Sequence, residues 1–580
     1  MKISKYLILP AFAFALLACQ KEGVLTNDTQ TDIFDEDVWS DSIKTVQVLT
    51  SAYSGLGPES YMTRINTSNT LSEYSDESDE RWSTTVPSTF TNTFQNGTYT
   101  ASSIPAPFNT LWGDTYKAIR IINLFITRVD ESPLSAKGKK RMKAEARFLR
   151  AWFYHILTKT YGGVPIIDRV LAVNEDLNLP RNTYEECVNF VTKDLDAAAA
   201  DLPISYVGQD YGRATKGACL ALKARVLLFA ASPLFNGGQL AANKDAIYGY
   251  KEYSPNRWVL ARDAAKAVID MGVYSLMLGT NNDNSTAEGF YKVFLTRNNP
   301  EMIFMRLSGS NRSYESSHLP KSRGGSLHTS PNGNYVNTFP MANGKPIADP
   351  TSGYDPQNPY VGRDPRFYRS VIYNGATWKT TSGTFGPVYT YLNAPTDGLT
   401  IPFTSVGTQS GYFNRKMMSE DVTGSTGGAE HLFPFLRYAE VLLNYAEALN
   451  ENGQTAEAYA PMAEIRKRAG LNPFNLPTGL TQDQMRTYIR DERRIELAFE
   501  EHRFYDIRRW KILPDTYCKP LRMMVITPKS GTITPLGTNY TYEERDFVKP
   551  PCPYNDNMYL LPIPQSQINI SSNLKQNPGW

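Results

Sequence analysis

The chain has 580 residues, of which 20% are charged and 12% aromatic, and its formal net charge is +2. A charge this close to zero argues against a nucleic-acid partner, while a chain this long can bury a large core as one domain or several. Five histidines and five cysteines, with no pair at metal-site spacing, predict no metal centre, and we expect no cofactor.

The first residues predict a secretory signal. Lys2 and Lys5 precede an apolar run over 6–17, which is shorter than the roughly 20 residues that span a membrane. The run ends in Leu16-Leu17-Ala18-Cys19, which resembles a bacterial lipobox. This resemblance implies that the chain is cut before Cys19 and that Cys19 is acylated. The alternative is an ordinary secretory signal that is cut elsewhere. We therefore expect a signal peptide over 1–18 and a lipidated tether over 19–36. The charged run 20–22 resembles surface-export signals of Bacteroidota lipoproteins, so we expect an outer-membrane protein that faces the exterior.

Apolar residues at helical spacing then predict a series of helices. They run over 112–129, 142–156, 184–202, 218–229, 257–271, 436–452, 455–469 and 481–510. Thr183 with Glu186 predicts a capping box, and Gly162-Gly163 predicts a helix end. Pro461 predicts a late start or a kink in the helix over 455–469.

These helices follow one another as adjacent pairs, an arrangement typical of tetratricopeptide-like (TPR-like) scaffolds. Between 279 and 433 the sequence is instead rich in Gly, Pro, Asn, Ser and Thr. A disordered linker is one interpretation, but short β-prone runs such as 302–306 and 367–373 favour ordered loops with small strands. We predict a mainly α protein: one domain over 37–580, with a helical scaffold (37–278 and 434–510), a loop-rich ligand-facing region (279–433) and a C-terminal loop segment (511–580).

Several motifs in this framework resemble the SusD/RagB family. They lie at 144–165, 213–225, 437–447, 465–470, 490–510, 561–564 and 576–579, in the order in which the family has them. The resemblance implies a non-catalytic outer-membrane lipoprotein that binds a nutrient, usually an oligosaccharide. It also implies a partner, a SusC-like TonB-dependent transporter, on which the protein acts as a lid.

Three other functions remain as alternatives. Part of the family captures peptides. A glycoside hydrolase would need two carboxylates across a cleft, one of them with a raised pKa, whereas the mixed charges of 490–509 predict ion pairs that keep the carboxylates ionised, so we expect no catalytic residue. A purely structural lipoprotein would bind no nutrient.

Tryptophans outside the helical frame are the first candidates for sugar contact, since a flat ring suits the C–H face of a sugar. Trp82, beside Asp79 and Arg81, and Trp378 both lie in polar loops. The alternative for each is a ring that plugs a loop onto the frame. Further candidates are the loop tyrosines Tyr314, Tyr389 and Tyr391, near Phe385.

The four cysteines after Cys19 lie in two kinds of sequence, predicted helices and loops. Cys187 and Cys219 fall at apolar positions of predicted helices and should be buried. Cys518 and Cys552 lie in loop-rich sequence and, after export, could form a disulfide or stay as two separate thiols.

Overall fold

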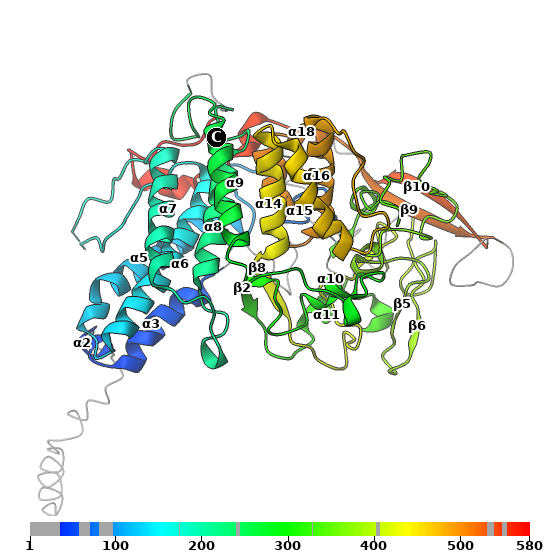
Figure 1. Ribbon diagram of the computed structural model, residues 1–580, viewed down its shortest axis with the longest axis horizontal. Helices are drawn as coiled ribbons and strands as arrows, with labels where there is room; N and C mark the ends of the chain where they lie inside the picture. The colour runs from blue at the N-terminus through cyan, green and yellow to red at the C-terminus, as the bar shows by residue number, and fades with distance from the viewer. Residues whose placement is uncertain are drawn as a thin grey trace, which may run out of the picture.

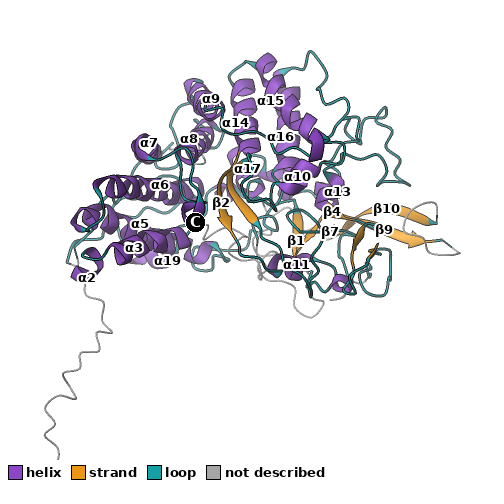
Figure 2. Ribbon diagram, turned by 60° about the horizontal axis from the view of Figure 1, so that its bottom comes forward, coloured by secondary structure: helices purple, strands orange, loops and turns teal. Residues whose placement is uncertain are grey.

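The computed structural model describes residues 35–56, 70–80, 97–172, 174–238, 240, 244–327, 329–401, 407–529, 539–547 and 554–580. Within these ranges the longer helices stand side by side across one part of the molecule, and the small strands and long loops gather at the other end (Figure 1). Turning the molecule keeps this division, with helices α5–α7 at one end and the β9–β10 hairpin at the other (Figure 2).

The described helices match most of the predicted series. Their bounds are α2 Asp35–Trp39, α3 Ser42–Ser54, α5 Phe108–Arg128, α6 Ala136–Tyr161, α7 Tyr184–Asp201, α8 Lys216–Ala231, α9 Asn256–Ile269, α10 Glu288–Lys292, α11 Ser313–His318, α12 Gly333–Val336, α13 Phe367–Ser370, α14 Tyr438–Glu451, α15 Thr455–Arg468, α16 Gln482–Glu496, α17 Arg503–Arg509, α18 Leu513–Tyr517 and α19 Gln565–Ile570.

Local signals set many of the helix ends. The predicted capping box of α7 is present, with Thr183 Oγ1 accepting from the Glu186 amide. Gly162 ends α6 with a φ of 84°, which a side chain would strain. Of the two alternatives for α15, a late start or a kink, the late start is wrong, because the helix begins at Thr455 and contains Pro461.

Consecutive helices pack in pairs along the row, as predicted for a TPR-like scaffold. Helix α6 packs on α5 and α7, α8 on α7 and α9, and α14 on α9 and α15. Each helix thereby buries its apolar face against two neighbours, and the mainly helical fold class is confirmed.

The predicted helix over 481–510 is divided in two. Helix α16 ends at Glu496 and α17 begins at Arg503. Between them Phe499 and Glu501 have φ values of 60° and 69°, which end the regular helix. The break turns the Glu496 and Ala498 carbonyls toward Lys416, whose Nζ donates to both at 2.8 Å.

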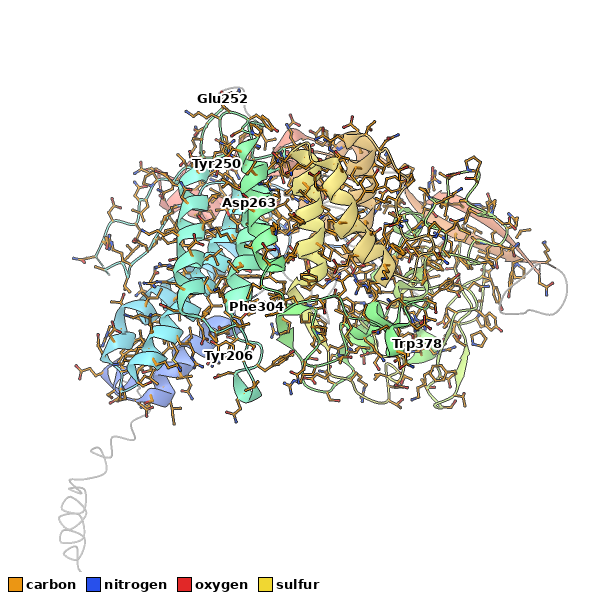
Figure 3. All side chains as sticks on the ribbon, in the orientation of Figure 1. Tyr206, Tyr250, Glu252, Asp263, Phe304 and Trp378 are labelled. Carbon is orange, nitrogen blue, oxygen red and sulfur yellow. The ribbon has the colours of Figure 1, made fainter. Side chains whose placement is uncertain are left out.

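Five two-stranded antiparallel sheets lie among the described residues. The predicted strand at 302–306 is confirmed as β2, and its Phe304 lies between the helices and the loops (Figure 3). The run 367–373 is partly helical instead, as α13 followed by β4. The pairs are β1 (Ser78–Glu80) with β3 (Thr329–Pro331), β2 (Met302–Leu307) with β8 (Leu432–Arg437), β4 (Val371–Ile372) with β7 (Phe413–Asn414), β5 (Thr377–Lys379) with β6 (Phe385–Pro387), and β9 (Leu521–Pro528) with β10 (Tyr540–Phe547).

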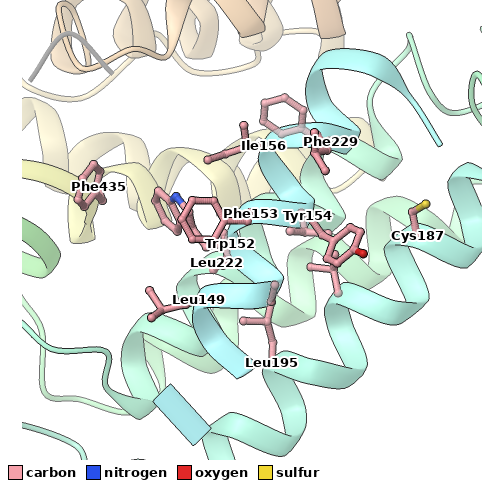
Figure 4. Close-up of a cluster of buried hydrophobic side chains, with 14 of the residues drawn as sticks. Leu149, Trp152, Phe153, Tyr154, Ile156, Cys187, Leu195, Leu222, Phe229 and Phe435 are labelled. Atoms are coloured by element: carbon pink, nitrogen blue, oxygen red, sulfur yellow. The ribbon is translucent and has the colours of Figure 1, made fainter. Parts of the chain in front are cut away.

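The largest core fills the space between α6, α7, α8 and the β2–β8 pair. Figure 4 shows Leu149, Trp152 and Ile156 of α6 facing Leu222 and Phe229 of α8, with Phe435 of β8 beyond. Cys187 and Cys219 are buried, free thiols, as predicted.

The C-terminal segment closes this frame from outside. The Leu561 amide donates to the Thr160 carbonyl of α6, and the Gln576 side chain exchanges two hydrogen bonds with the Ile563 backbone. In the part of the chain that the structure describes, no helix combines the length and hydropathy needed to cross a bilayer.

Candidate ligand-binding surface

The first candidate from the sequence, the segment 79–82, lies only partly within the described residues. Asp79 is in β1, opposite Ser330 of β3, so its backbone position is known. Arg81 and Trp82 follow it in the chain, outside the described residues. Their contact with a ligand stays a prediction.

Trp378 is a core residue. Its ring is fully buried, and its Nε1 donates to the Val422 carbonyl at 3.1 Å. The Arg415 guanidinium covers the ring at 5.1 Å from its centroid. Although Trp378 lies in the loop-rich end (Figure 3), no face is open to a sugar, and the plug interpretation replaces ligand contact.

Tyr314 is likewise no ligand platform. Only 1% of it is exposed, and its hydroxyl accepts from Asn414 Nδ2 at 3.2 Å. Helix α11 turns the ring inward against His318 and Phe433, because its apolar face is better buried than exposed.

Tyr389 and Tyr391 remain accessible, and their rings lie together. Both are half-buried, and their ring centroids are 5.7 Å apart at an interplanar angle of 60°. Thr390 between them is fully buried, so the two tyrosines lie on the same, outer face of an extended segment. Tyr540 of β10 continues the group at 5.9 Å from Tyr391.

The segment that carries these rings is tied down on both sides. The Val388 amide donates to the Ala376 carbonyl, and the Leu392 amide donates to Ile526 of β9. Between them the Thr390 amide donates to Asn374 Oδ1 at 2.9 Å. Alternate hydrogen bonds along the segment hold the tyrosines in place before any ligand arrives.

Phe385, four residues before Tyr389, is an exposed ring in the same part of the chain. It lies at the start of β6 and is 57% exposed, although exposed rings are unfavourable without a partner. Three hydroxyls surround the hairpin end beside it: Thr380 Oγ1 lies 2.9 Å from Ser382 Oγ and 3.0 Å from Thr384 Oγ1. Phe385, Tyr389 and Tyr391 form what we call the aromatic row.

Buried polar groups support the row from behind. The Arg323 Nη2 donates to the Gly386 and Pro387 carbonyls at 2.9 and 2.8 Å. Burial lowers the pKa of Arg323 and raises the pKa of Asp397, which accepts from the Ser322 amide and hydroxyl. Sequence reasoning missed these residues, because Arg323 meets the β6 carbonyls, and Asp397 meets Ser322, only in the folded chain.

The carboxylates that a hydrolase would use lie inside an ion-pair network. Burial alone would raise the pKa of Glu496, but Arg468, Arg437 and Arg366 outweigh it and hold that pKa at about 2. The partners of Glu496 come from other elements, whereas the sequence predicted ion pairs along one helix, such as Asp506 with Arg509 in α17. A carboxylate held ionised and fully buried cannot donate a proton to a substrate.

Comparison with known proteins identifies the chain. The sequence profile of the SusD family matches residues 295–580, and a second profile, described as starch-binding associating with outer membrane, matches residues 28–228. The chain belongs to the SusD/RagB family. This family consists of non-catalytic binding proteins, in agreement with the network around Glu496.

Solved structures of the family share the fold over nearly the whole chain. A SusD-like protein from Bacteroides fragilis is 29% identical, with a TM-score of 0.75 over 94% of this chain and 99% of that one. A second Bacteroides fragilis protein, described as a SusD-like carbohydrate-binding protein, is 26% identical, with a TM-score of 0.71 over 93% and 100%.

Relatives known by sequence extend the comparison. SusD-like protein P25 of Formosa agariphila is 23% identical over 89% of this chain and 91% of its own. SusD-like protein P2 of the same organism is 36% identical, but the match covers only 25% of each chain.

Proposed function

We propose that this SusD/RagB protein binds an oligosaccharide at the cell surface and delivers it to a SusC-like TonB-dependent transporter. The aromatic row is the observation that carries glycan binding. It offers two neighbouring rings, Tyr389 and Tyr391, at alternate positions of a fixed segment, with the exposed Phe385 four residues before them and hydroxyls at the β5–β6 hairpin end. Flat apolar faces beside planar or hydroxyl groups are what a sugar ring needs.

The relatives support this ligand class. One similar structure is described as a carbohydrate-binding protein, and one matching profile as starch-binding. Asp79, Arg81 and Trp82 stay proposed contacts from the segment that follows β1. Lipidation at Cys19, exposure at the outer membrane and the division into 1–18, 19–36 and 37–580 are part of the same proposal.

A glycan-array screen followed by calorimetry on the best ligand tests the proposal. Tyr389→Ala and Tyr391→Ala each remove a ring that would stack on the sugar, so we expect affinity to fall by about 1–3 kcal/mol, roughly 5- to 150-fold. We expect the same loss for Trp82→Ala. Tyr253→Ala is the matched control, since Tyr253 is also an exposed tyrosine, 60% accessible, outside the loop-rich end.

Glycan binding that survives Tyr389→Ala and Tyr391→Ala unchanged would remove the row from the site. A screen in which peptides bind and glycans do not would favour the peptide-capturing branch of the family. Release of reducing sugar from the ligand would overturn the non-catalytic assignment.

A further inference from the structure

A hollow lies at the opposite end of the molecule from the aromatic row. It has a volume of about 530 Å³ and is bounded by α5, by segments 165–172 and 177–179, and by α19 with the residues after it. Helix α5 lies at the left in Figures 1 and 2, whereas the β5–β6 hairpin lies at the right of Figure 1.

The walls of this hollow are aliphatic and aromatic. Trp112 and Tyr116 of α5 form one side, and Leu179 and Leu574 are on the others. Leu177 and Ile570 line it as well but are 59% and 74% exposed, which costs free energy unless something covers them.

Polar groups here are used to build the walls. The Tyr116 hydroxyl donates to the Pro165 carbonyl at 2.8 Å. Asn178, between Leu177 and Leu179, accepts from Ser571 Oγ and the Asn573 amide, each at 2.8 Å. This clamp holds the C-terminal segment against the 177–179 segment, so the hollow exists before any ligand binds.

Charge at the hollow has one sign. Lys117, Arg120 and Arg169 line it, and no acidic residue does. Lys117 pairs with Asp114, and Arg169 pairs with Glu175, both outside the lining. Arg120 is exposed and forms no ion pair with any described residue, so one cation at the hollow is uncompensated.

We propose that this hollow binds a single-chain fatty acid, with the acyl chain along the apolar walls and the carboxylate at Arg120. An aliphatic chain covers Leu177 and Ile570 and needs no hydrogen-bond partner. A sugar would bring hydroxyls to mainly apolar walls, where the Tyr116 and Ser571 hydroxyls already donate to Pro165 and Asn178, at a cost. The site is separate from the proposed glycan surface.

Calorimetry with palmitate tests the proposal on the full chain carrying Cys19→Ala, purified without detergent. We expect one palmitate per chain. Gly113→Phe is the blocking variant: Gly113 lines the hollow on α5, and a Cβ there meets no atom within 4 Å. We expect it to weaken palmitate binding at least about tenfold.

Gly309→Phe is the matched control, because a Cβ at Gly309 also meets no atom within 4 Å and the residue lies elsewhere. Arg120→Gln should weaken palmitate about three- to tenfold and leave hexadecanol, the uncharged analogue, unchanged. An unfolding midpoint equal to that of the parent chain shows that each variant is folded.

Three outcomes would overturn the proposal. These are no palmitate binding by the parent chain, an equal loss in Gly113→Phe and Gly309→Phe, and equal binding of palmitate and hexadecanol that Arg120→Gln does not alter. Failure of glycan binding alone would affect the proposed function and leave the fatty-acid site standing.

Discussion

The indole of Trp378 shows how one buried side chain can support a surface from beneath. It lies in a cluster with Tyr314, Phe413 and Phe433, while its hairpin partner strand carries Phe385 outward. Side chains alternate between the inner and outer faces of the β5–β6 hairpin. The burial of Trp378 and the exposure of Phe385 therefore depend on the same register between the two strands.

We expect Trp378→Ala to destabilise the protein by about 3–5 kcal/mol, because the variant leaves a cavity and an unpaired Val422 carbonyl. Urea unfolding measures the loss, and Trp378→Phe should lose less. A variant of normal stability that no longer binds the glycan would return Trp378 to the list of ligand contacts.

Two buried histidines make stability depend on pH. Burial is the largest cause that lowers the pKa of His155 and of His502 well below their usual value, and nearby cations lower it further. In the unfolded chain each titrates near 6.5, so below about that pH the unfolded state binds more protons than the native one. The free energy of unfolding therefore falls as the pH drops below about 6.5, and it continues to fall until the pH reaches the lowered pKa of each native histidine.

The variant His155→Phe isolates one of them, since His155 packs its ring against Phe229. We expect its unfolding free energy to rise relative to the parent as the pH falls from about 7.5 to 5. Glu77, whose pKa burial raises to about 8, acts in the opposite direction but in both proteins alike. A parent–variant difference that stays constant over this range would contradict the assignment.

At the scale of elements, the break between α16 and α17 joins the helices to the strands. Arg437 at the end of β8 donates to Glu500 Oε2 at 2.6 Å, to Glu301 Oε1 at 2.7 Å and to Glu496 Oε1 at 2.8 Å. A continuous helix would carry Glu500 away from this arginine. The left-handed residues Phe499 and Glu501 are therefore part of how the two halves meet.

We expect Arg437→Gln to destabilise the protein by about 3–5 kcal/mol, because it leaves buried carboxylates without their cation. Arg545→Gln, which removes an exposed arginine paired with Glu543, should change stability by less than about 0.5 kcal/mol. Chemical unfolding of both variants measures the difference. Equal midpoints would show that the buried network contributes no more than a surface pair.

At the scale of the whole molecule, the proposed lipid anchor and the proposed transport role are linked. Such an anchor would raise the effective concentration of the protein at a transporter in the same membrane, so strong affinity in solution would not be required. We expect Cys19→Ala to release the folded chain from the outer membrane, measured by fractionation after a salt wash. The unmodified protein, purified in mild detergent, should bring a SusC-like barrel with it.

Membrane association of Cys19→Ala after salt washing would contradict the lipid anchor, and repeated absence of a barrel would contradict the transport role.

The predicted disulfide also concerns segments far apart in the chain. Cys518 is disulfide-bonded, while its predicted partner Cys552 lies outside the described residues. The pairing stays a prediction that mass spectrometry of the native protein can test.

By itself the sequence determined the helices, most of their ends and the family. Caps such as Thr183 with Glu186 and stops such as Gly162 act through hydrogen bonds within a few residues, so they can be read locally. The family motifs are likewise continuous runs, and they identified the SusD/RagB fold before any contact was known.

Only the tertiary structure decided which aromatic rings face solvent. Trp378 and Tyr389 lie eleven positions apart in similar loop sequence, yet one is sealed by Val422 and Arg415 and the other is open. The split of the last long helix and the hollow between α5 and α19 also depend on segments far apart in the chain. Exposure and long-range ion pairs are properties of packing, which local propensity does not contain.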